Sequence, residues 1–142
     1  MSDCIFCRIV RGELPSTKIY EDDAVLAFMD IGPIIKGHTL VIPKQHFDPL
    51  TAVPPPLLGR IMAVVQRVMR AQIEGLHADG VNVHQTNGAA AGQVVPHVHV
   101  HVIPRFTHDG HSWNWRAGSY QGAAEMNEWA DRIRKAFPPT GS

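Results

Sequence analysis

The chain has 142 residues, 44% of them hydrophobic, and its formal net charge is zero with histidine counted as neutral. This length and composition predict one globular domain with a real core, and the lack of a basic excess argues against nucleic-acid binding. No apolar run is long enough to span a membrane, and the N-terminal segment lacks the apolar core of a signal peptide, so we expect a cytoplasmic protein.

Hydrophobic periodicity and turn residues divide the chain into short strands and three helices. In chain order we expect a helix over 4–11, strands over 19–21, 25–29 and 38–43, a long helix from Pro54 to Gly75, strands over 81–86 and 97–103, and a helix over 126–137. Pro104 is expected to end the last strand. Runs of strands with two separated main helices predict an α+β domain with an antiparallel sheet.

Residues 96–105 read PHVHVHVIPR, so that His97, His99 and His101 alternate with valines. In a strand the three histidines share one face, and the valines form a core face on the other. A row of imidazoles suits metal binding, nucleophilic catalysis, or simple exposure on a half-solvated sheet. The small residues of 87–96 favour a chemical role, because such a loop lets its backbone N–H groups bind an anion such as a phosphate.

Cys4 and Cys7 form a C-x-x-C pair and are the only cysteines of the chain. One pair is too few for a disulfide scaffold, which leaves redox chemistry or metal ligation. A thioredoxin-like redox pair follows a strand in a βαβ unit, whereas no strand is expected before Cys4. The position of the pair therefore weighs against redox chemistry.

The stretch GQVVPHVHVHVIPR closely resembles the motif of the histidine triad (HIT) family, and residues 4–46 resemble the N-terminal half of that family in order and spacing. Together these stretches span most of residues 4–105. The resemblance implies a HIT-like α+β domain with a five-stranded antiparallel sheet and two main helices. It implies one domain over 1–142, with a core over about 4–105, an extension with a helix over about 106–138, and a homodimer whose sheets join.

The resemblance also implies a hydrolase that acts at the α-phosphate of a purine nucleotide, either a nucleoside phosphoramidate or a dinucleoside polyphosphate. His99 corresponds to the nucleophile, which forms a covalent nucleotidyl-histidine that water then cleaves. The carbonyl of His97 orients it, His101 stabilises charge or assists the leaving group, and His38 supports the cluster. Three alternatives are a nucleotide-binding regulatory protein with little turnover, a nucleotidyl transferase, and a catalytic metal site made by the triad itself.

A nucleotide pocket can be assigned in the same way. The resemblance implies contacts from Ile5, Phe6, Ile9, Phe28, Asp30, Ile31, Asn87, Gln93, Val94, His99 and His101. Asp30 would accept hydrogen bonds from the ribose hydroxyls, although a loop-capping role is the alternative. The apolar members would line the purine, although ordinary core packing is their alternative. Val94 stands where many relatives carry serine or threonine, so a phosphate contact there has to come from the backbone.

Some bacterial-type members of the family hold a structural zinc ion. The matching positions here are Cys4, Cys7, His46 and His97, a Cys₂His₂ set typical of a closed tetrahedral site that would pin the N-terminal helix to the sheet.

The remaining histidines have weaker assignments. His77 and His84 are expected to be structural. His108 and His111 lie near Trp113 and Trp115 and suit either leaving-group recognition or a dimer surface.

Overall fold

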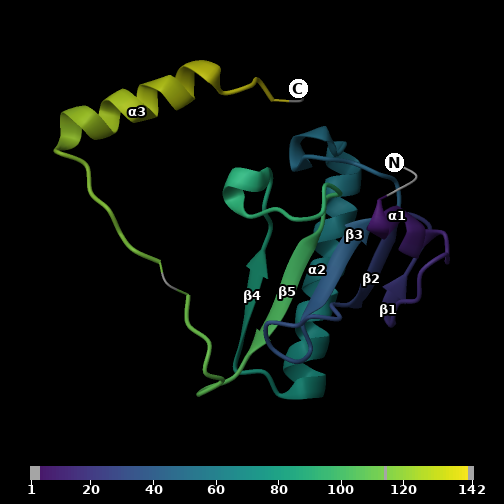
Figure 1. The fold of residues 1–142 in the computed structure, drawn as a ribbon. Coiled ribbons are helices and arrows are strands. Elements are labelled where there is room, and N and C mark those ends of the chain that lie inside the picture. The colour runs from purple at the N-terminus through teal and green to yellow at the C-terminus, as the bar shows by residue number, and fades with distance from the viewer. Residues whose placement is uncertain (1–3, 114, 141–142) are drawn as a thin grey trace. The chain divides into compact units, whose positions relative to one another are not determined.

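The computed structural model describes residues 4–113 and 115–140. The chain forms two compact units, Met1–His111 and Ser112–Ser142. The first unit contains α1 (Ile5–Val10), β1 (Lys18–Glu21), β2 (Val25–Met29), β3 (Thr39–Pro43), α2 (Pro55–Leu76), β4 (Gly80–His84) and β5 (Val100–Arg105), and the second contains α3 (Ala123–Ala136) (Figure 1). Single 3₁₀ turns occur at Leu50–Ala52 and Ala89–Ala91.

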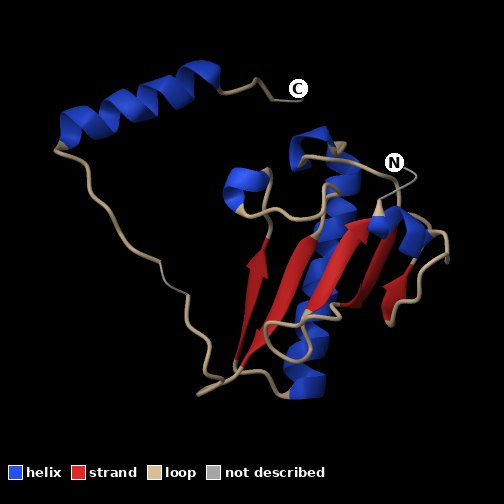
Figure 2. Cartoon of the chain, viewed as in Figure 1, coloured by secondary structure: helices blue, strands red, loops and turns tan. Residues whose placement is uncertain are grey.

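The strands form one five-stranded antiparallel sheet in the order β1-β2-β3-β5-β4 (Figure 2). The predicted α+β class and antiparallel sheet are therefore confirmed. β5 inserts between β3 and β4, so the last strand of the unit lies next to the middle of the sheet.

The two faces of the sheet bury different elements. α2 packs on one face, where the apolar core includes Val41, Val65, Val100 and Val102. The opposite face carries α1, and its core consists of Phe6, Ile9, Leu26, Phe28, Leu40 and Ile42. Successive residues of β2 and β3 belong to opposite cores, as the two-residue period of a strand requires. β3 is buried throughout because both of its faces are covered.

The long helix begins at Pro55, one residue after the predicted start, and has proline in its first turn as expected, where the missing N–H costs nothing. Its end differs from the prediction. Gly75 stays helical, the helix runs to Leu76, and His77 takes the left-handed conformation with φ of 57°. The backbone N–H of His77 caps the carbonyl of Gln72. The left-handed residue that ends the helix thus lies two positions after Gly75, the predicted end.

The histidine strand is shifted relative to the prediction. β5 begins at Val100, because the N–H of Val98 donates to the carbonyl of Phe47 at 2.8 Å, outside the sheet. Pro104 does not end the strand, which continues to Arg105. β3 pairs with β5 only as far as Val102, so Pro104 lies where one side of the strand has no neighbour, a position that tolerates proline. β4, expected over 81–86, covers Gly80–His84.

The C-terminal helix is confirmed as an element, but none of its residues is buried. Its large apolar side chains are exposed, including Trp129 at 52% and Ile133 at 65%. Among the described residues, no helix is both long and apolar enough to cross a membrane.

Candidate active site

The three triad histidines lie on the sheet face that carries α1, and the alternating valines face α2, as the spacing predicted. His99 is buried, and its Nδ1 lies 2.6 Å from the carbonyl oxygen of His97. A carbonyl only accepts, so Nδ1 carries the proton and donates it. Nε2 of His99 is therefore the unprotonated nitrogen, with its lone pair available for attack.

A directed hydrogen-bond chain sets the tautomers of His38 and His101. The backbone N–H of Ile34 donates to Nδ1 of His38 at 3.1 Å, so the proton of the neutral His38 ring is on Nε2. That Nε2–H donates to Nδ1 of His101 at 2.9 Å. The proton of His101 is consequently on its own Nε2. His101 thus presents an N–H donor beside His99, whose ring centroid lies 4.9 Å away.

The environment of His101 favours its neutral form. Burial, followed by repulsion from His99, His38 and His84 when these are protonated, lowers its pKa to about 4, although Asp30 acts in the opposite direction. Burial also lowers the pKa of His38. At neutral pH the neutral forms of His38 and His101 are therefore favoured in the free protein, and an incoming phosphate supplies negative charge that favours protonation.

These shifts predict a loss of stability in acid. The pKa of His101 lies below its ordinary 6.5, so between pH 6.5 and about 4 the unfolded chain binds a proton that the folded chain excludes. The free energy of unfolding should fall across this window by about 2 kcal/mol from His101, after allowance for solvent screening. Urea unfolding at both ends of the window checks this. His101→Asn should lose less stability than wild type, and equal losses would exclude His101 as the cause.

A pocket of about 280 Å³ opens between α1 and the start of β3. Six of the predicted nucleotide-binding residues line it, namely Ile5, Phe6, Ile9, Phe28, Asp30 and Ile31. The side chain of Ile31 is 99% exposed, so it contributes to the mouth and not to the wall. Asp30 accepts the N–H of Gly32 through Oδ1 at 2.8 Å, and its Oδ2 lies 3.6 Å from Nε2 of His38. The pocket thus joins an apolar wall to a carboxylate at the histidine cluster.

The side-chain amides of Asn87 and Gln93 fix the conformation of the loop after β4 through hydrogen bonds. Oδ1 of Asn87 accepts the N–H of Leu50 at 2.8 Å. Gln93 accepts the N–H of Gly88 at 2.6 Å and donates to Asp48 at 2.7 Å. Val94 is 89% exposed. The described contacts of Asn87 and Gln93 shape the loop, and their role toward a phosphate stays a prediction.

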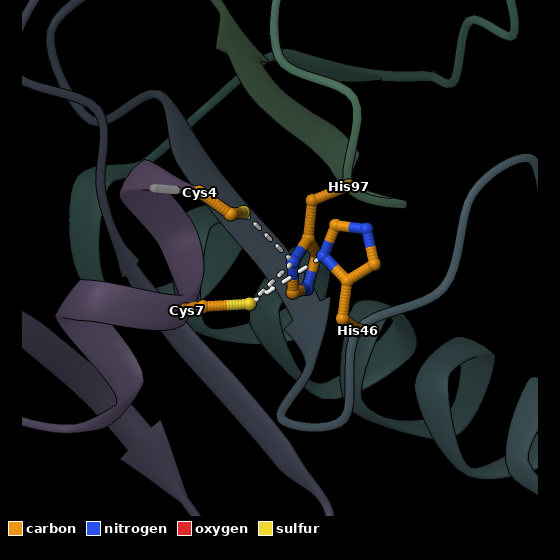
Figure 3. A group of neighbouring side chains, drawn as sticks. All are labelled: Cys4, Cys7, His46 and His97. Atoms are coloured by element: carbon orange, nitrogen blue, oxygen red, sulfur yellow. Dashed lines mark hydrogen bonds between the residues drawn. The ribbon is translucent and has the colours of Figure 1, made fainter. Parts of the chain in front are cut away.

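The predicted metal ligands Cys4, Cys7, His46 and His97 come together (Figure 3). Nδ1 of His97 lies 3.4 Å from the Cys4 sulfur and 3.7 Å from the Cys7 sulfur, and Nδ1 of His46 lies 3.4 Å from the latter. A tetrahedral zinc ion with ordinary bond lengths separates sulfur and nitrogen ligands by about 3.5 Å. Nε2 of His97 donates to the carbonyl of Pro43 at 2.9 Å, which leaves the lone pair of Nδ1 facing the sulfurs. The donor set therefore fits zinc.

Two residues, His97 and Phe6, connect the candidate metal site to the candidate nucleophile His99. His97 contributes its ring to the cluster and its carbonyl to His99. Phe6, between the two cysteines on α1, packs edge-on against the rings of His97 and His99, with centroids 5.7 and 5.1 Å apart. Order at the cluster is thereby linked to the orientation of His99.

The structure places one further histidine beside the triad, which the sequence analysis did not assign to the site. His84 pairs with His101 across the β4–β5 ladder, with ring centroids 5.9 Å apart. The alternation of residues 81–86 predicted a strand, but the register that opposes these two residues depends on the loop between the strands. His108 and His111 lie in a turn after β5, where Asp109 accepts the N–H of His111 at 3.0 Å and pairs with Arg105.

The HIT domain family model matches residues 11–108. The chain belongs to the HIT family. Adenylylsulfatase HINT3 of Arabidopsis thaliana is 43% identical over 108 residues, which cover 76% of this chain and 55% of that protein. Adenosine 5′-monophosphoramidase HNT1 of Candida albicans is 37% identical over 134 residues, which cover 89% of this chain and 88% of that protein.

Solved structures of HIT proteins share the fold. A HIT family protein from Bacillus subtilis superposes with a TM-score of 0.90 at 37% identity and covers 97% of this chain and 99% of its own. A zinc-bound histidine triad family protein from Mycobacterium smegmatis has a TM-score of 0.75 at 41% identity and covers 95% of this chain and 98% of its own. The predicted HIT-like fold is therefore confirmed.

Proposed function

We propose that this HIT protein is a hydrolase that cleaves purine nucleotides at the α-phosphate and releases the nucleoside monophosphate. The observation that supports this most strongly is the hydrogen bond from Nδ1 of His99 to the carbonyl of His97, which directs an unprotonated imidazole nitrogen into the site. Relatives named as an adenosine 5′-monophosphoramidase and an adenylylsulfatase support the substrate class.

The proposed reaction proceeds in two displacements. Nε2 of His99 attacks the α-phosphorus, an N–P bond forms, and the bond to the leaving group breaks. The resulting positive charge on the imidazole is stabilised at Nδ1–H by the His97 carbonyl. Water then attacks the same phosphorus, the N–P bond breaks, and the nucleoside monophosphate leaves. His101, with its Nε2–H directed by His38, donates to phosphate oxygen or to the leaving group.

The test is AMP release from adenosine 5′-phosphoramidate, adenylyl sulfate and diadenosine tetraphosphate, measured side by side. All three carry an adenylyl group, so they differ only in what leaves the phosphorus. Hydrolysis of at least one substrate supports the proposal. If AMP binds but none of the three is cleaved, the reading as a nucleotide-binding protein with little turnover replaces it.

Asp30 is proposed to accept hydrogen bonds from the ribose hydroxyls at the edge of the apolar pocket. Asp30→Asn replaces a charged acceptor by a neutral amide, and a hydrogen bond to a charged group contributes about 2 kcal/mol. We expect KM to rise about tenfold while kcat changes less than about twofold. The matched control is Asp23→Asn, which changes an exposed carboxylate paired with Arg60 and should leave both constants unchanged. An equal effect of the two substitutions would contradict the ribose role.

The Cys4, Cys7, His46 and His97 cluster is proposed to hold a structural zinc ion. A bound Zn²⁺ stabilises thiolates and would fasten α1, and with it Phe6 and Ile9, to the sheet. The cluster supplies four ligands, so zinc would have no open position for substrate. This favours a structural role over metal catalysis at the triad.

The chain is also proposed to act as a homodimer in which two sheets join. β4 is an edge strand of the sheet, with backbone groups available for pairing. The large apolar residues of α3 are exposed, among them Met126, Trp129 and Ile133. Light scattering coupled to size-exclusion chromatography should give twice the mass of the chain, whereas the mass of a monomer would contradict the proposal.

A further inference from the structure

His84 occupies the end of edge strand β4, directly opposite His101 on β5. Opposed residues of an antiparallel pair project from the same face of the sheet. The two rings lie 5.9 Å apart, with their planes at 60° to one another. His84 therefore belongs to the imidazole face that carries His99.

The strand order places His84 on the side of the nucleophile away from the nucleoside pocket. The pocket lies over α1, β2 and the start of β3. β5, which contains His101 and directly follows His99, lies beside β3 in the sheet, and β4 lies beyond it. A substrate with its nucleoside in the pocket and its α-phosphorus at His99 thus meets His101 and then His84 as it extends across the sheet.

We propose that His84 is a specificity-determining residue for the leaving group, which acts with His101 to bind leaving groups that carry acceptor oxygens, such as sulfate. This rests on the proposed hydrolase function. Burial is the main cause of the lowered pKa of His101, and repulsion from His99, His38 and His84, when protonated, adds to it against the effect of Asp30, so His84 is within electrostatic reach of that ring. Two imidazoles at this spacing offer two N–H donors to one tetrahedral oxyanion.

The chemistry of the leaving group explains why a second donor discriminates. With either substrate, Nε2 of His99 forms the same N–P bond. Adenylyl sulfate breaks a P–O bond, and sulfate leaves with the electron pair and needs no proton. It also carries three further oxygens that accept hydrogen bonds. The phosphoramidate breaks a P–N bond, and its nitrogen leaves as ammonia after taking a proton, with no acceptor oxygen for a second imidazole.

The experiment compares kcat/KM for adenylyl sulfate and adenosine 5′-phosphoramidate in wild type, His84→Leu, His84→Arg and Val83→Thr. Val83 is the neighbouring residue on β4 and pairs with Val102, so its side chain projects from the opposite face. Leucine has no N–H donor, so loss of one charge-assisted hydrogen bond should make His84→Leu lower the sulfate-to-amidate ratio about tenfold. His84→Arg supplies an N–H donor at the same position and should keep most of the ratio, and Val83→Thr should not change it.

Each outcome has one meaning because both substrates share the adenylyl group. A ratio that His84→Leu leaves unchanged overturns the role of His84 while the hydrolase function stands. The same holds if wild type cleaves the phosphoramidate but not adenylyl sulfate. If His84→Leu slows both substrates equally, the residue is structural and the proposal fails. If wild type cleaves neither of these substrates, the role of His84 is overturned, and the proposed function fails with it only if diadenosine tetraphosphate is not cleaved either.

Discussion

Substitution of His99 by alanine is expected to lower kcat for AMP release by about 10⁴-fold or more, since loss of a catalytic nucleophile removes the covalent route altogether. AMP binding should weaken by no more than about fivefold, the equivalent of one hydrogen bond. The reason is that the nucleoside pocket is built from α1, β2 and the start of β3, and not from β5. AMP release and calorimetric titration with AMP measure the two effects separately.

The matched control for His99→Ala is His77→Asn. His77 ends α2 in a left-handed conformation that asparagine tolerates, and the substitution removes an imidazole outside the cluster. It should retain full activity. Rapid alkaline quench of the wild type, which preserves an N–P bond, followed by intact mass spectrometry should detect one adenylyl group per chain, and His99→Ala should show none. An active His99→Ala variant would contradict the assignment of the nucleophile.

Removal of one metal ligand by Cys7→Ser is expected to abolish stoichiometric zinc binding and to destabilise the fold. A ligand present at a thousandfold above its Kd stabilises the folded state by about 4 kcal/mol. For a domain of this size that corresponds to a decrease in Tm of about 10 °C. Elemental analysis of protein purified without chelators and thermal unfolding measure both effects. Wild type without bound metal, or equal Tm values, would contradict a structural zinc site.

The same variant should also slow the reaction, since His97 serves both the cluster and the hydrogen bond to His99. Arg8→Gln is the control on the same helix, because Arg8 is partly exposed and belongs to a salt bridge with Glu13. It should keep its zinc, its Tm and its activity. If a chelator stopped the wild-type reaction at once with no loss of structure, a catalytic metal at the triad would be favoured instead.

Local sequence was sufficient for the elements whose periodicity is strong. The predicted strand at 25–29 coincides with β2, and the valines of the histidine strand face α2 as expected. Element ends were less predictable, because they depend on contacts made by other parts of the chain. Val98 donates to Phe47 and leaves the ladder, and Pro104 is tolerated because β3 stops pairing at Val102.

Residue types, their spacing and the family pattern were sufficient to identify the main residues of the candidate site. The three alternating histidines, the C-x-x-C pair and Asp30 were identified without coordinates. What only the tertiary structure decided was which atoms face one another. The proton of His99 lies on Nδ1 because the backbone turns the His97 carbonyl toward it, and the register of β4 against β5 places His84 beside His101. The loop between β4 and β5 and the burial of one sheet face fix the register, and the backbone conformation around His97 sets the direction of the hydrogen bond, so residue spacing alone predicts neither.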